Sequence, residues 1–416
     1  MSVTGEPLKH PLAELLSAGF GHRYREGFVV TQPGGIVMPA EFLLDAQRIL
    51  DFPVKEDDVW LVTFPKSGTT WTQELVWLLM NEMDFKTAKE ICITERFRYI
   101  ERMSTLPKAT RQGAPDTIQL AADQPSPRLI KSHLPPALLP RQLWSVRPKI
   151  IYVARSPTDA ATSYYYFNRL VHGISLSLDE FLECFLADVV QFTPYWTSVL
   201  EFWNLRSEPN ILWNTYEEMK QDVGAVIRKT AAFLGKSVTD EQLHQLEGHL
   251  SFSSMRANPA TNCSDVMLSL RTSIGLPPPP SDQAFMREGK VGQARLRMSP
   301  EMNRRFDQWI QENIRGTGGR ARKAKQAPLP MARRAANRCA AHANAHIFGC
   351  LGNGCQSPPP DAALDPIVCR AGAEVGGTDF PKSAAPTDLR DSQGGHRNRP
   401  RKKWPLVVIN PMFKCV

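Results

Sequence analysis

Lysine, glycine and hydroxyl side chains follow one another in the stretch TFPKSGTTW at residues 63–71. Lys66 supplies a mobile full charge, Gly68 permits close approach of the backbone, and Thr69 and Thr70 add hydroxyl donors. The apolar run DVWLVTF precedes the stretch and TQELVWLLM follows it. If these flanks are a strand and a helix, backbone N–H groups and the positive end of the helix favour an anion at the loop. The spacing is not that of a Walker A loop, and an ordinary turn with capping threonines explains this stretch equally well on its own.

Two further stretches repeat this chemistry. KIIYVARSPTDAATSYYYF reads as a strand, a loop and a helix, with Arg155 at the end of the strand and Ser163 about two helical turns later. FMREGKVG carries Arg287, Gly289 and Lys290 in a loop with several glycines. Three anion-friendly loops in one chain point to a ligand with several anionic groups.

A histidine follows another strand-like run. RLIKSHLP places Lys131 and His133 at or just past the end of a strand, where doubly wound sheets have their sites. A neutral imidazole with a pKa near ~6.5 can take up a proton at cellular pH, so His133 is the candidate general base. A structural histidine with satisfied hydrogen bonds is the alternative for this residue taken alone.

The pattern of the chain predicts a scaffold for these residues. Short apolar runs predict buried strands at 59–64, 128–133, 149–154 and 210–215. Amphipathic periodicity predicts helices at 71–82, 157–171, 178–187, 193–206, 222–234, 239–248 and 299–314. Strands that alternate with helices predict an α/β fold with a mostly parallel central sheet flanked by helices. Region 96–127 lacks clear periodicity, and we expect a long loop there.

Composition bounds the class of protein. The chain has 416 residues, of which 42% are hydrophobic, so it can bury a large core. No stretch approaches the ~20 apolar residues of a membrane span, and the first residues do not resemble a signal peptide. The eight cysteines are scattered without a C-x-x-C pair, which is typical of a reduced compartment. We therefore expect a cytoplasmic protein without a membrane partner.

The basic surplus belongs to the C-terminal part of the chain. Residues 317–416 hold 16 Lys and Arg against 6 Asp and Glu, so they carry +10 and the remainder carries −2. Their composition is rich in Ala, Arg, Gly and Pro, and we expect a disordered, low-complexity tail. RPRKKW in this tail is a nucleic-acid patch or a solvated charge run, and the Cys/His cluster at 339–355 fits no standard zinc finger. A nucleic-acid partner would rest on the tail alone, and we expect none for the body.

In combination, the motifs resemble those of the cytosolic sulfotransferases, which use 3′-phosphoadenosine 5′-phosphosulfate (PAPS). FPKSGTTW resembles their phosphosulfate loop, RLIKSHLP the segment of the catalytic histidine, and YVARSPTDAATSYYYF the 3′-phosphate motif. NTYEEMKQD and FMREGKVG are similar to two later motifs, and ELVWLLMNEMDF and MSPEMNRRFDQWI to stretches of arthropod members. The resemblance covers roughly residues 40–315. It implies an N-terminal segment at 1–39, a single sulfotransferase domain with a P-loop-like phosphosulfate loop at 40–316, and the tail at 317–416.

The resemblance also implies a role for each matching residue. Lys66 would stabilise charge on the leaving group, and Lys131 and His133 would face the acceptor. PAPS would be the co-substrate, without a metal. The residues that would bind it are Ser67, Gly68, Thr69, Thr70, Trp71, Arg155, Ser163, Tyr216, Ser251, Phe252, Met255, Arg287 and Gly289.

The implied activity is sulfuryl transfer to a hydroxyl of a small, largely apolar acceptor such as a phenol, a sterol or a retinoid-like alcohol. Aromatic side chains suit a pocket for a flat acceptor, or they belong to the core. The candidates are Tyr164, Tyr165, Tyr166, Phe167, Phe64 and Phe252.

Departures from the family pattern leave alternatives open. Glu288 stands where the family has Lys, and a carboxylate there would repel the 3′-phosphate unless Lys290 compensates. Residues 293–295 also differ from the family's loop, and the family's dimerisation motif has no match at 295–304. The alternatives are a catalytically impaired PAPS-binding relative and a nucleotide-dependent kinase, and dimerisation by the family's route is not predicted.

Overall fold

The structure is a computed structural model that describes residues 2–111, 113–280 and 283–315. A five-stranded sheet with the order β5-β6-β4-β7-β8 forms its centre, and all the neighbouring strands are parallel. The strands of this sheet are β4 (Val59–Thr63), β5 (Arg98–Tyr99), β6 (Leu129–Ser132), β7 (Lys149–Ala154) and β8 (Ile211–Thr215). The prediction of an α/β fold with a parallel central sheet is confirmed.

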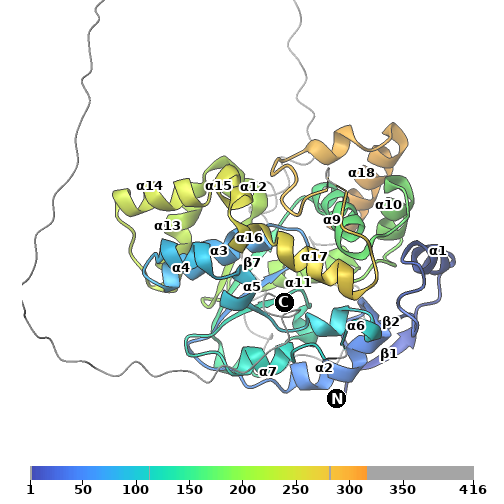
Figure 1. The fold of residues 1–416 in the computed structure, drawn as a ribbon, viewed down its shortest axis with the longest axis horizontal. Helices are drawn as coiled ribbons and strands as arrows, with labels where there is room; N and C mark the ends of the chain where they lie inside the picture. Colours follow the sequence, from blue (N-terminus) through green and yellow to red (C-terminus); the bar gives the residue numbers. More distant parts are fainter. Residues whose placement is uncertain (1, 112, 281–282, 316–416) are drawn as a thin grey trace, which may run out of the picture. The chain divides into compact units, whose positions relative to one another are not determined.

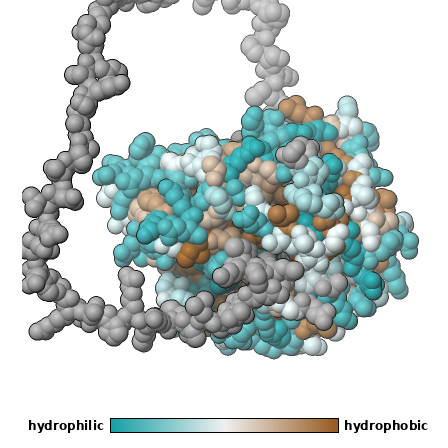
Figure 2. Space-filling view, in the orientation of Figure 1, coloured by the Kyte–Doolittle hydropathy of each residue, from teal (hydrophilic) through white to brown (hydrophobic). Residues whose placement is uncertain are grey.

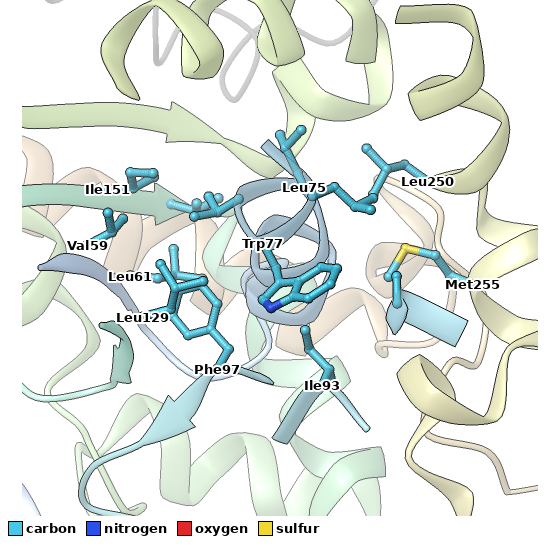
Figure 3. Packing of buried hydrophobic residues seen from close by; sticks show 14 of the residues in the cluster. Val59, Leu61, Leu75, Trp77, Ile93, Phe97, Leu129, Ile151, Leu250 and Met255 are labelled. Atoms are coloured by element: carbon cyan, nitrogen blue, oxygen red, sulfur yellow. The ribbon is translucent and has the colours of Figure 1, made fainter. Parts of the chain in front are cut away.

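Helices cover both faces of this sheet, which explains why its strands read as continuous apolar runs. On one face, Leu61 and Ile151 pack toward α3 (Thr69–Met80), and Trp77 of α3 occupies the middle of that cluster (Figure 3). On the other face, the ring of Tyr152 stacks on Phe202 of α11 (Tyr195–Leu205) with 4.4 Å between centroids. Successive strand residues point to opposite faces, so each face receives its own set of large side chains.

Seven helices match the seven predicted ranges to within a few residues: α3, α9 (Pro157–His172), α10 (Leu178–Leu186), α11, α13 (Val223–Leu234), α14 (Asp240–His249) and α18 (Pro300–Arg315). The other α-helices are α1 (Pro11–Gly19), α2 (Leu43–Leu50), α4 (Phe85–Glu90), α5 (Ile93–Arg96), α6 (Lys108–Arg111), α7 (Thr117–Ala122), α8 (Leu143–Val146), α12 (Tyr216–Gln221), α15 (Phe252–Ala257), α16 (Pro259–Asn262) and α17 (Ser264–Ser273). Figure 1 shows how they are arranged around the strands.

A small antiparallel sheet, which the sequence analysis did not predict, is formed near the N-terminus. It consists of β1 (Thr4–Pro7), β2 (Phe28–Gln32) and β3 (Val37–Pro39) in that order. The backbone N–H of Val37 donates to the Thr193 carbonyl, and that of Phe192 donates to the Val37 carbonyl, each at 2.8 Å. The small sheet therefore fixes the segment that leads into α11.

The expectation of a long loop at 96–127 is wrong. This region contains β5, the 3-10 helix η2 (Met103–Thr105), α6 and α7. Each element is only two to six residues long, too short for a detectable apolar period. The C-terminal segment 317–416, with its basic patch and Cys/His cluster, lies outside the described residues.

The surface in Figure 2 shows hydrophobic side chains in small groups among hydrophilic ones. Within the described ranges, no helix has the length and hydropathy needed to cross a bilayer.

A buried ion pair ties together the beginnings of two neighbouring strands. Arg128, just before β6, donates to both carboxylate oxygens of Asp58, just before β4, at 2.7 and 2.6 Å. The arginine also donates to the Pro53 carbonyl at 2.7 Å. Both side chains are essentially inaccessible, so either charge would be left uncompensated without its partner.

Replacement of Asp58 by Asn should therefore lower the free energy of unfolding by about 3–5 kcal/mol, measured by urea denaturation. The matched control is Glu208→Gln at the exposed Arg147–Glu208 pair, which should cost at most about 1 kcal/mol. Equal, small losses in the two variants would contradict this assignment.

Candidate active site

The loops that follow β4, β6 and β7 line one cavity, together with residues 285–290 and 293–294. Most of the predicted site residues meet there: Lys66, Gly68, Thr69, Thr70, Trp71, Lys131, His133, Arg155, Ser163, Tyr216, Phe252, Met255, Arg287 and Gly289. Ser67 and Ser251 are not among the lining residues. Ser67 is a fully buried residue of the loop after β4, and the Ser251 hydroxyl caps the N-terminus of α15.

The loop after β4 bends sharply into α3. Gly68 is the N-cap residue of α3 with a φ of 95°, and a Cβ there would lie 2.9 Å from the ring of Tyr216, so the position requires glycine. The first-turn N–H groups of α3 have no acceptor within their own helix, and the helix dipole adds positive potential there. Among the described residues, the buried hydroxyl of Ser67 has no hydrogen-bond partner. The loop thus has the properties of an anion cradle.

Lys66 extends into this cavity between two aromatic rings. Its Nζ lies 4.1 Å from the ring centroid of Phe285 and 4.7 Å from that of Phe167. Burial, followed by the neighbouring cations Lys131 and Arg155, lowers the pKa of Lys66 to about 7. An anion bound beside Lys66 would stabilise its charged form and raise that pKa again.

His133 is oriented by the last residue of β4. Its Nδ1 lies 2.8 Å from the carbonyl oxygen of Thr63 and 3.1 Å from the Thr63 hydroxyl. A carbonyl only accepts, so we assign the proton to Nδ1, which leaves the lone pair of Nε2 free. Burial, and then the charge of Lys131, hold the pKa of His133 well below its usual 6.5, so the ring stays neutral. The rings of Tyr99 and Phe192 pack against the imidazole, with 5.2 and 5.6 Å between ring centroids.

A buried carboxyl group holds the backbone of the histidine from the other side. Glu101 accepts hydrogen bonds from the backbone N–H of His133 and from the Ser132 hydroxyl. Burial raises the pKa of Glu101 to about 7. Nearby, the Nζ of Lys131 lies 4.3 Å from the ring centroid of Tyr99, and burial lowers the pKa of Lys131 to about 8.

Arg155, at the end of β7, connects two of the predicted loops. Its Nη1 donates to the carbonyl of Lys66 at 2.9 Å, and its guanidinium carbon lies 4.2 Å from the ring centroid of Tyr216. Its buried Nε has no partner among the described residues. The arginine thus keeps a donor for a further acceptor.

The loop at 285–294 is held against α9. Asp159 of α9 accepts the backbone N–H groups of Gly292 at 2.7 Å and Ala294 at 3.2 Å. Gly289 has a φ of 63°, and a Cβ there would lie 2.3 Å from the ring of Phe252. The departures from the family pattern at 293–295 therefore leave a loop that is still anchored at the cavity.

Glu288 is compensated by arginines. Its carboxylate forms ion pairs with Arg287 and Arg297. The expected partner, Lys290, forms no ion pair within the described residues; its carbonyl instead faces Arg155 at 3.4 Å. Arg297 lies outside every family motif, so the sequence did not indicate it.

The aromatic run in α9 divides between two environments. Tyr164 and Phe167 line the cavity, whereas Tyr165 and Tyr166 do not. Only side chains three or four residues apart share a helix face, so four consecutive aromatics cannot all face one cavity. Phe64 also lies outside the cavity, in an aromatic cluster of the core. Of the two alternatives left open for these aromatics, a place at the cavity holds for Tyr164, Phe167 and Phe252, but not for Phe64, Tyr165 and Tyr166.

Several residues that line the cavity were not predicted from the sequence, among them Tyr99, Arg102, Gln191 and Phe192. Tyr99 and Arg102 lie at the carboxyl end of β5, which was not predicted as a strand. Had β5 been detected, its end would have joined the same sheet edge as the other candidates.

The family model described as "Sulfotransferase domain" matches residues 56–318, which is more than half of the chain. The chain belongs to the sulfotransferase family. This family membership confirms the resemblance on which the expected activity was based.

Individual sulfotransferases show the extent of the similarity. Luciferin sulfotransferase of Photinus pyralis is 37% identical over 317 residues, covering 74% of this chain and 85% of the relative. Sulfotransferase 1E1 of Bos taurus is 32% identical over 289 residues, covering 68% and 92%. The solved structure of retinol dehydratase with retinol and PAP has a TM-score of 0.69 at 29% identity, covering 77% of this chain and 99% of the other.

The raised pKa of Glu101 predicts a pH-dependent contribution to stability. Between pH 4.5 and about 7 the folded protein keeps this proton while the unfolded chain loses it, so wild-type stability falls as the pH rises. Glu101→Gln, which retains an acceptor for His133, should remove that fall. Relative to wild type, its free energy of unfolding should gain about 1–3 kcal/mol from pH 5 to pH 8 in urea titrations. Parallel pH profiles of the two proteins would contradict the assignment.

Proposed function

We propose that this protein transfers the sulfuryl group of PAPS to a hydroxyl of a small, largely apolar acceptor, with His133 as general base and Lys66 stabilising the leaving group. The observation that carries the proposal is the placement of these two side chains. They follow neighbouring parallel strands and line one cavity, where the carbonyl of Thr63 binds the Nδ1 of His133. Family membership supports the type of reaction.

The groups around the β4 loop fit a donor with separate anionic ends. The Gly68 turn and the N-terminus of α3 suit the 5′-phosphosulfate, and the unpartnered Nε of Arg155 suits the 3′-phosphate together with Ser163. Trp71 and Tyr216 pack edge to face with 5.8 Å between ring centroids, which forms an aromatic wall suited to a nucleobase. When bound, PAPS supplies an activated sulfuryl group.

The chemical roles follow from the protonation states. Nε2 of neutral His133 accepts the proton of the acceptor hydroxyl, whose oxygen can then form a bond to sulfur. Protonated Lys66 stabilises the negative charge that accumulates on the bridging oxygen as its bond to sulfur breaks. Sulfuryl transfer, like phosphoryl transfer, depends mainly on alignment and on charge neutralisation.

The acceptor side of the cavity is largely apolar. Its wall includes Val171, Met267 and Leu270, and the aromatic rings of Tyr164 and Phe167. Structures of retinol dehydratase contain retinol or androsterone, and such flat alcohols suit this lining. We propose a cytoplasmic location, for which the free thiols of Cys92, Cys184 and Cys263 give support.

The direct test is turnover of a labelled sulfate donor against a panel of phenols, sterols and retinoids. We expect sulfated product from at least one class, and none from labelled ATP. Absence of product from the whole panel, in folded protein that binds the donor, would favour the catalytically impaired alternative.

Loss of the base should lower the rate without unfolding the protein. We expect His133→Ala to lose about 10²–10⁴-fold in kcat, because general-base assistance is typically worth that much. Lys66→Met should lose about 10²–10³-fold, because it removes a charge aimed at the leaving group. Single-turnover rates with matched thermal unfolding curves check both. Wild-type rates in either variant would refute the role of that residue.

The low pKa of His133 predicts the acid limb of the pH profile. Because the base stays unprotonated below pH 6.5, kcat/KM for the donor should remain near its plateau at pH 6.5 and fall only at lower pH. The acceptor in this measurement should be an alcohol, because its hydroxyl does not ionise in this pH range. A limb centred at pH 6.5 or higher would contradict the assignment.

A further inference from the structure

Arg102 is a cation on the cavity wall that the proposed reaction does not use. It follows β5 and directly precedes η2, and its backbone carbonyl accepts the hydroxyl of Thr105 at 2.7 Å. The side chain lines the same cavity as His133. Arg102 is partly buried, and this burial lowers its pKa.

The Arg102 guanidinium has no partner of its own among the described residues. No carboxylate lies within 4.0 Å of it in that part of the chain, and its nitrogens form no hydrogen bond or ring contact there. The fully buried arginines have partners: Arg96 pairs with Glu74, and Arg271 donates to three backbone carbonyls. Because even a partly buried charge loses hydration and is stabilised by a counter-charge, an unpaired guanidinium on a cavity wall is suited to an anion supplied from outside.

The order of strands places Arg102 away from the donor side. Along the carboxyl edge of the sheet, Arg155 follows β7, Lys66 follows β4, His133 follows β6 and Arg102 follows β5. The base therefore lies between the proposed donor loops and Arg102. An acceptor whose hydroxyl reaches His133 has room to extend toward Arg102, because both residues line the same cavity.

The remaining charges near Arg102 do not neutralise it. Beyond the effect of burial, the charge of Lys131 lowers the pKa of His133. The Glu101 carboxyl accepts from His133 and Ser132 through Oε1. Its buried Oε2 forms no hydrogen bond or ion pair with Arg102 among the described residues. Hydrogen bonding to Cys263 lowers the pKa of Cys92 to about 6, so Cys92 is an anionic neighbour of Arg102, but in the part of the chain that the structure describes neither sulfur forms a hydrogen bond with the guanidinium. Within the described ranges, Arg102 and Lys131 therefore line the cavity without a carboxylate as ion-pair partner.

We propose that the preferred acceptor carries a carboxylate in addition to its hydroxyl, and that Arg102 binds this carboxylate with support from Lys131. A planar guanidinium matches a carboxylate with two parallel hydrogen bonds. This inference rests on the proposed function and narrows its acceptor to a hydroxy acid with an apolar body. Arg102 thereby sets specificity, whereas His133 and Lys66 serve the transfer itself.

The test compares two acceptors that differ only in charge. 3-(4-Hydroxyphenyl)propanoate and 3-(4-hydroxyphenyl)propanamide have similar shapes and nearly equal phenol acidity, because a saturated spacer separates the ring from the variable group. In wild type, kcat/KM should favour the acid by about 10–100-fold, as expected for charge-assisted hydrogen bonds in a dry site.

Arg102→Gln should reduce this acid-to-amide ratio to about one, mainly through a higher KM for the acid, and Arg102→Lys should retain an intermediate ratio. The matched control is Arg98→Gln, which removes the same charge from a side chain of β5 that does not line the cavity. The control should keep the wild-type ratio. Thermal unfolding curves establish that each variant is folded.

Calorimetric binding of the acid to the protein with adenosine 3′,5′-bisphosphate separates this inference from the proposed function. Binding that depends on Arg102 supports the inference even where no sulfate is transferred. Sulfation of the amide with a wild-type ratio of one or below overturns the inference and leaves the proposed function standing. The inference is also overturned if Arg98→Gln lowers the acid-to-amide ratio as much as Arg102→Gln does.

Discussion

The hydrogen bond between Nδ1 of His133 and the carbonyl of Thr63 is the contact on which the site depends. It joins the ends of β4 and β6, sets the tautomer of the imidazole, and leaves Nε2 free for the acceptor. The same Thr63 hydroxyl lies 2.8 Å from that of Thr69, at the start of α3. One strand end thus orients both the base and the anion-binding turn, and the pairing of β4 with β6 and β7 holds that strand end in place.

The cavity concentrates positive charge that the fold does not neutralise. Burial depresses the pKa of Lys66 and Lys131, which form no ion pair among the described residues, whereas buried cations elsewhere, such as Arg128, have carboxylate partners. Desolvated cations lower the stability of the folded protein at its functional site, and bound anionic ligands restore that stability. Arg102 fits this pattern on the acceptor side.

The main strands and the phosphosulfate loop were predictable because they depend on local signals. β4 and β7 are continuous apolar runs, and the glycine, lysine and threonines between β4 and α3 can be recognised from their types. β5 could not be found in this way, because two residues carry no period, and Arg102 could not be assigned to the site without it. The sequence did not show which aromatics of the run at 164–167 line the cavity, because the direction of a side chain depends on its position around the helix. The pairing of Glu288 with Arg297 was not predictable because it depends on tertiary contact alone.

The central claim is that buried cations at this sheet edge bind a doubly phosphorylated nucleotide. Titration calorimetry of the full chain with adenosine 3′,5′-bisphosphate at pH 8, in two buffers of different ionisation enthalpy, tests it most directly. Because the pKa of Lys66 is about 7 and must rise beside a phosphate, the account predicts a heat of binding together with proton uptake. Folded protein that shows no heat of binding, or binding without proton uptake, would contradict it.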